Sequence, residues 1–178
     1  MKKKIIIATL ALTLILCFAI GTTLAWLNDS TEEIKNTFTY GDINISLTES
    51  ENLDLKMVPG KTITKDPKVT VKGDSEACWL FVEITESANF SNFMAYAVAD
   101  GWTALADNPG VYYREVASSA NDQSFFVLDK NQVTVSDTVT KSDFEAIGDS
   151  NPTLTFKAYA VQTEGVNTVA YAWEIVQK

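Results

Sequence analysis

Short stretches rich in β-branched and aromatic residues recur along the chain, and in several of them apolar and polar residues alternate at a period of two. This period is typical of half-buried β-strands. Gly, Pro, Asn, Asp and Ser separate the stretches and favour turns between them. The pattern therefore predicts many short strands rather than a helical protein. The predicted strands are 43–47, 61–65, 69–71, 111–113, 125–128, 133–135 and 154–160.

A further strand pattern, at residues 78–84, is apolar on both faces. Its even-numbered residues are all apolar, and Trp79 and Phe81 make the opposite face apolar as well. A strand of this kind is expected to be covered on both sides.

Two segments place their apolar residues at helical spacing. Residues 90–97 do so after a cap at Asn89 or Ser91, and Gly101 ends the run. We expect a short amphipathic helix there, covering the second face of strand 78–84. A second helical face is predicted near the C-terminus within 167–177, and it carries Val169, Trp173 and Val176.

Many short strands with two short helices predict a mostly β fold, an antiparallel β-sandwich with short helices. Neither an internal repeat nor a low-complexity linker divides residues 37–178, so they are predicted to form one domain.

The first 25 residues have the pattern of a secretory signal peptide. Three lysines are followed by an uncharged apolar run, and Thr23 and Ala25 supply the small residues that a signal peptidase accepts. We predict cleavage between Ala25 and Trp26, which removes residues 1–25. The alternative is an uncleaved anchor, because the uncharged stretch 5–27 could span a bilayer. In both cases the remainder of the chain lies outside the membrane.

Charge and composition exclude several classes of function. The chain has 14 basic and 23 acidic residues, for a net charge of −9. This balance disfavours binding to nucleic acid or to anionic lipid. The chain has no histidine, so Ser-His-Asp and Cys-His catalysis and imidazole metal sites are excluded.

Cys78 is the only cysteine after the signal peptide, because Cys17 lies in its apolar run. No intramolecular disulfide is therefore available to the mature chain, although an exported protein could form one. We expect Cys78 to be a buried small hydrophobe. A reactive thiol or an intermolecular bridge is the alternative.

Motifs along nearly the whole chain resemble one family. Residues 21–29 look like the signals processed by a SipW-type signal peptidase. Residues 38–47 and 65–73 resemble the camelysin/TasA-type domain that follows such signals, and motifs in 100–114 and 158–173 are similar to clostridial members.

The resemblance implies a jelly-roll-like sandwich that is a secreted structural subunit of extracellular fibres, in the biofilm matrix or on the surface of a Gram-positive cell. The implied partners are further copies of the chain and the SipW-type peptidase. Fibres of this kind are expected to grow by donor-strand addition, with the leader 26–36 pairing with a neighbour's sheet edge. Its first residues, Trp26, Leu27, Asn28 and Asp29, are the predicted polymerisation site.

Elementary chemistry is compatible with this assembly. Trp26 and Leu27 are apolar on a polar leader, which is unfavourable in water and favourable in a neighbour's groove. A disordered tail is the alternative interpretation of the leader.

Some relatives have been described as metalloproteases, but this chain has no histidine and no metal-binding motif. We therefore expect no enzyme activity, no metal and no cofactor. Residues 129–131 and 149–151 could donate oxygens to calcium, although surface turns commonly have this composition. Glu83 and Glu86 could in principle act as a glycosidase pair, but a solvated strand end explains them as well.

The alternative function is a monomeric surface-binding module for a glycan or a host protein. It would use exposed aromatic side chains, with Trp102, Tyr112 and Tyr113 as the candidates. Packing in a β core explains these rings equally well.

Overall fold

The computed structural model describes residues 42–50, 56–148 and 150–178. Residues Tyr40–Lys178 form one compact unit. The predicted signal peptide, the leader and the cleavage site at Ala25 and Trp26 lie outside the described residues. In chain order the elements are β1 (Ile45–Thr48), β2 (Thr62–Thr64), β3 (Lys68–Val71), β4 (Cys78–Glu86), α2 (Phe90–Phe93), β5 (Met94–Ala95), β6 (Thr103–Ala104), β7 (Val111–Val116), β8 (Gln123–Phe126), η1 (Asp129–Asn131), β9 (Gln132–Val135), α3 (Lys141–Ile147), β10 (Leu154–Gln162) and α4 (Val169–Val176).

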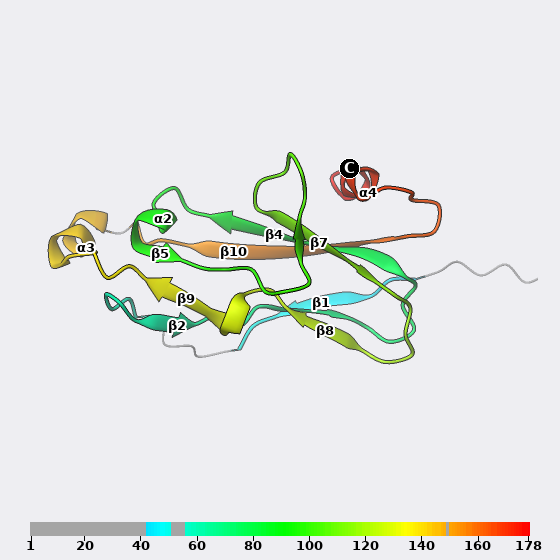
Figure 1. Cartoon of the computed structure of the whole chain (residues 1–178), viewed down its shortest axis with the longest axis horizontal. Helices are drawn as coiled ribbons and strands as arrows, with labels where there is room; N and C mark the ends of the chain where they lie inside the picture. Colours follow the sequence, from blue (N-terminus) through cyan, green and yellow to red (C-terminus); the bar gives the residue numbers. More distant parts are fainter. Residues whose placement is uncertain (1–41, 51–55, 149) are drawn as a thin grey trace, which may run out of the picture. The chain divides into compact units, whose positions relative to one another are not determined.

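The strands of this unit form two layers in which every pairing is antiparallel. One layer is a four-stranded sheet with the order β10-β4-β7-β6. The other consists of two three-stranded sheets, β1-β3-β8 and β2-β9-β5. Figure 1 shows β4, β10 and β7 on one side and β1, β8, β2 and β9 on the other. The predicted fold class, a mostly β antiparallel sandwich with short helices, is confirmed.

Two short connections join the two sheets of the second layer. β2 leads into β3 through Lys65–Pro67, and β8 leads into β9 through η1. Pro67 has no backbone N–H to donate, so a strand ladder does not run through it unbroken. The layer is therefore divided into two sheets that follow one another.

The main core lies between the layers. Leu80 and Val82 of β4 pack with Val69 and Val71 of β3, and all four are nearly inaccessible to solvent. Full burial of an aliphatic side chain contributes about 1.5–3 kcal/mol each. The alternation of apolar residues along these strands accounts for which of their faces is buried.

The second apolar face of β4 is covered by α4. Phe81 is fully buried there, with its ring centroid 5.2 Å from that of Trp173. The hydroxyl of Thr168 accepts a hydrogen bond from the backbone N–H of Tyr171 and caps the helix. Strand 78–84 is thus covered on both sides as predicted, and the predicted C-terminal helical face packs on it.

The prediction for residues 90–97 is wrong in two respects. The helix is a single turn, Phe90–Phe93, and the chain then enters β5, where Met94 pairs with Val135. The segment also lies against the core between the layers rather than against the outer face, because Phe90 belongs to that core. Strand pairing with β9 outweighs the helical spacing of the apolar residues, a tertiary effect that the local pattern does not contain.

A helix that the hydrophobic pattern does not predict, α3, begins after Thr140. The Thr140 side chain accepts from the N–H of Asp143, and the Asp143 carboxylate accepts from the N–H of Thr140. This reciprocal capping box is a sequence signal for a helix start.

Candidate functional site

β2 lies at the edge of its sheet. On the β9 side, the Lys61 carbonyl accepts a hydrogen bond from the Val135 N–H, and the Lys65 N–H donates to the Asn131 carbonyl. Backbone groups alternate in direction along a strand, so those of Thr62 and Thr64 point away from β9. Among the described residues no strand pairs with β2 on that side.

A mostly apolar groove of about 640 Å³ opens beside this edge, between β2 and β10. It is lined by side chains from both layers, so it leads from the surface toward the main core. Its lining residues are Lys56, Met57, Ile63, Lys65, Phe90, Met94, Val133, Asn151, Pro152, Thr153, Leu154 and Thr155.

The groove occupies only one end of the sandwich. At the end formed by β1, β3 and β8, which we call the closed end, β1 covers the edge of β3 and also lies against β10. At the end formed by β2, β9 and β5, the open end, no described strand takes the position that β1 takes beside β3. The open end therefore offers both a strand edge and an apolar groove.

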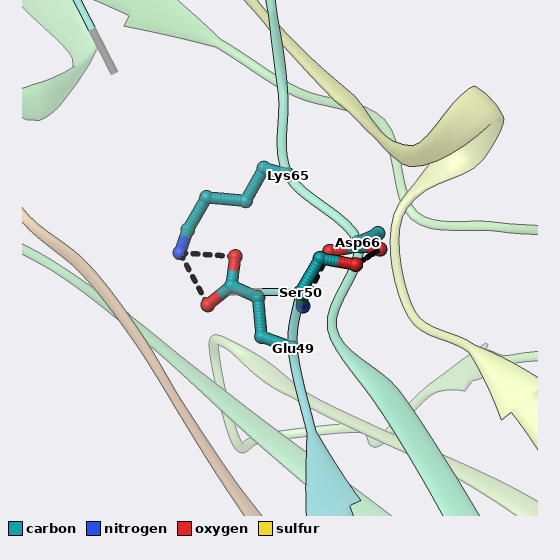
Figure 2. A network of polar contacts seen from close by, with 4 residues as sticks. All are labelled: Glu49, Ser50, Lys65 and Asp66. Carbon is teal, nitrogen blue, oxygen red and sulfur yellow. Dashed lines mark hydrogen bonds and ion pairs between the residues drawn. The ribbon is translucent and has the colours of Figure 1, made fainter. Parts of the chain in front are cut away.

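A polar network lies where the two ends meet (Figure 2). The Lys65 ammonium donates to both carboxylate oxygens of Glu49 at 2.7 and 2.8 Å. Beside this pair, the Ser50 backbone N–H and hydroxyl both donate to the Asp66 carboxylate. These two hydrogen bonds hold the pKa of Asp66 below its usual value, since they favour the charged form. The network fixes the chain just after β1 to the joint between β2 and β3.

This arrangement is suited to accepting an extended peptide. The outward backbone groups of Thr62 and Thr64 can pair with a further strand, and the groove can take alternate side chains of that strand. Exposed sheet edges are the usual sites of strand addition.

The aromatic residues that the binding-module alternative needs are not an exposed platform. Trp102 is 9% exposed, and its indole N–H donates to the Phe126 carbonyl at 2.9 Å. The Arg114 guanidinium lies 5.4 Å from the Trp102 ring. Tyr112 packs against the main core, and Tyr113 packs against the core beneath α4. Of the two explanations given by the sequence, packing in the core therefore describes these rings, with Trp102 buried and the two tyrosines partly buried.

Cys78 is fully buried, as predicted. Burial raises the pKa of its thiol to about 11, because the thiolate would lose its hydration. A thiol in this state is a poor nucleophile at neutral pH.

Glu83 and Glu86 do not form a pair. Counted along β4 they lie three residues apart, so their side chains project from opposite faces of the sheet. Glu83 accepts from the Tyr159 hydroxyl and Glu86 from the Tyr96 hydroxyl, both at 2.9 Å. The glycosidase arrangement therefore has no geometric basis.

The calcium candidates give no site in the part of the chain that the structure describes. Asp129, Lys130 and Asn131 form η1, and the Lys130 ammonium lies 3.7 Å from the Asp129 carboxylate. Asp149 lies outside the described residues. Within 42–50, 56–148 and 150–178, no group of three or more Cys, Asp or Glu side chains could hold a metal ion. Over the same residues, no helix has the length and apolar character needed to cross a bilayer.

Comparison with known proteins gives one match. The sequence model of a family described as camelysin metallo-endopeptidase matches residues 1–86, just under half of the chain. The matched part ends with the last residue of β4 and contains the Glu49 and Lys65 pair. It supports the resemblance to the camelysin/TasA-type family. Comparisons with curated proteins and with solved structures give no match.

The groove itself was not predicted from the sequence. Pro67 between two strand patterns indicates a break in a strand, which is the only local signal of the joint between the two ends. Which edge stays open depends on the pairing of β1 with β3, a contact between distant segments.

Proposed function

We propose that this chain is a secreted structural subunit of extracellular or cell-surface fibres, assembled by donor-strand addition. The leader 26–36 of one copy pairs with the open edge of β2 in the next copy and places its apolar residues in the groove. The groove beside an open strand edge is the observation that carries the proposal. The family match over residues 1–86 supports a secreted or surface location.

The energetics of such a contact are adequate for a polymer. Each backbone hydrogen bond formed along β2 contributes about 0.5–1.5 kcal/mol net. Trp26 buries an area of about 150–250 Å² when its ring is enclosed, and aromatic anchors of this size commonly dominate binding. Pairing through the backbone places few demands on the other leader side chains.

Export completes the proposal. A SipW-type signal peptidase cleaves between Ala25 and Trp26, which frees the leader, and the mature chain remains outside the cell without a membrane anchor. N-terminal sequencing of secreted protein should begin Trp-Leu-Asn-Asp. Full-length protein retained in the membrane would instead support the anchor alternative.

Two purified chains test the assembly step, one starting at Trp26 and one starting at Thr37. The first should form fibres visible by electron microscopy, and the second should remain a folded β-rich monomer by circular dichroism and sedimentation. A third chain starts at Trp26 and carries Trp26→Ser and Leu27→Ser, so it controls for the length of the leader. It should also fail to polymerise, because it lacks the apolar residues that enter the groove. Fibres of unchanged morphology from the chain that starts at Thr37 would refute donor-strand assembly. If no chain polymerises, the surface-binding alternative gains support.

Proteolysis is the second candidate function, because the matching family is described as a metallo-endopeptidase. The absence of histidine removes the most common zinc ligand from any such site. Incubation of the Trp26 chain with casein, with and without added zinc, tests this candidate. Zinc-dependent cleavage that a chelator abolishes would establish a protease, and we expect none.

A further inference from the structure

The charge of the groove differs from that of the chain as a whole. Two lysines, Lys56 and Lys65, are among the described residues that line the groove, and none of those lining residues is acidic, although Glu49 pairs with Lys65 beside it. The chain as a whole has 23 acidic and 14 basic residues. The leader 26–36 has the opposite character to the groove, with three acidic residues and one lysine. Opposite charges favour this leader over a basic or uncharged strand as the occupant.

The Lys65 side chain lines the groove and is largely shielded from solvent. Its side chain is 16% exposed, it pairs with Glu49, and it lies 5.4 Å from the centroid of the Phe156 ring. A partly desolvated ammonium of this kind needs an anionic partner. Any carboxylate that enters the groove can satisfy it as Glu49 does.

We propose that Lys65 is the carboxylate-binding position of the groove, and that Glu49 occupies it in the free subunit. This inference rests on the proposed function. When the leader of a second copy enters the groove, one of its acidic side chains takes the place of Glu49 on the ammonium. The exchange replaces one ion pair with another, so Lys65 attracts the incoming strand while Glu49 competes with it.

Competition makes a prediction that a purely structural salt bridge does not make. Lys65→Gln and Glu49→Gln break the same ion pair, so a structural role predicts similar effects from both. The proposed role predicts opposite effects on assembly. Glu49→Gln should lower the critical concentration for polymerisation about tenfold, because Lys65 then gains a charge pair on assembly without first losing one. Lys65→Gln should raise it about threefold, because only the difference between the pair with the leader and the partly exposed pair with Glu49 is lost.

Matched variants control for net charge. Lys61→Gln changes the charge by the same amount next to β2, but Lys61 does not line the groove. Glu76→Gln does the same for Glu49, since Glu76 is exposed and lies outside the groove. Both controls should stay within about twofold of the unmodified chain. Lys65→Arg should retain assembly, because it keeps the positive charge.

The measurement is the critical concentration of the chain starting at Trp26, by sedimentation, at low and high salt. We expect the Lys65→Gln chain to be less sensitive to salt than the unmodified chain, because an attraction between charges has been removed. Shifts of Lys65→Gln and Glu49→Gln in the same direction, or no shift beyond the controls, overturn the inference and leave donor-strand assembly intact. Failure of the unmodified chain to polymerise overturns the proposed function, and this inference falls with it.

Discussion

The two ends of the sandwich have similar strands and different edges. At the closed end, β1 pairs with β3 residue by residue from Ile45 opposite Val71 to Thr48 opposite Lys68. At the open end, β2 is the edge strand of its sheet. β3 would be an edge strand in the same way if β1 did not pair with it. The comparison teaches that the open edge does not follow from the local sequence of β2. It follows from where β1 stops and where the Glu49–Lys65 pair fixes the chain after it.

The largest expected difference between the ends is in core stability. Leu80 is fully buried in the main core, whereas Leu154 is partly buried and lines the groove. Leu80→Ala should lower the free energy of unfolding by about 3 kcal/mol, and Leu154→Ala by about 1 kcal/mol, because the second site is already open. Urea unfolding measures both. Equal losses would mean that the groove is closed in the free subunit.

The pH dependence of stability reports on the main core through Cys78. Its pKa is raised from 9.0 to about 11 in the folded chain, so the unfolded chain ionises first as the pH rises. The contribution of Cys78 to the free energy of unfolding should be constant below about pH 9. It should fall by about 2 to 3 kcal/mol in total between about pH 9 and 11. The difference between the unmodified chain and Cys78→Ala isolates this contribution from the tyrosines and lysines. A difference that does not change with pH would show that the thiol is hydrated.

Two adjacent proline substitutions separate the two sides of β2. Ile63 has its backbone directed toward β9 and pairs with Val133, while Thr64 directs its backbone outward. Ile63→Pro should cost about 2 kcal/mol of stability, because it removes a ladder hydrogen bond and leaves the acceptor unpaired. Thr64→Pro should change the free energy of unfolding by less than about 1 kcal/mol, because only the outward N–H is lost. It should nevertheless inhibit fibre formation, since that N–H is needed to pair with the incoming strand. The opposite ranking would mean that the edge assignment of β2 is wrong.

The sequence predicted those features of the fold that depend on residues close together in the chain. The alternation in the strands, the two apolar faces of β4 and the helical face that carries Trp173 are all read from neighbouring positions. The capping box at Thr140 is also present in the sequence, but α3 buries no residue fully, so no strong apolar stripe accompanies this signal.

Features that depend on distant contacts could not be predicted. Phe90 joins the core between the layers because β5 pairs with β9, and no local period specifies that pairing. Trp102 was a candidate for an exposed ring, yet its partners Arg114 and Phe126 come from other strands. The groove has the same origin, since its walls come from β2, β9 and β10.

Hydrogen exchange of the Thr62 and Thr64 amides, resolved by residue in monomer and in fibre, tests the central claim most directly. In the monomer both amides should exchange quickly, as expected for an open edge, and in the fibre they should be slowed about a hundredfold or more. The outward amides of β8, the edge strand of the sheet at the closed end, provide the internal control and should change little. Unchanged exchange at Thr62 and Thr64 in fibres, or new protection along β8 instead, would contradict the account.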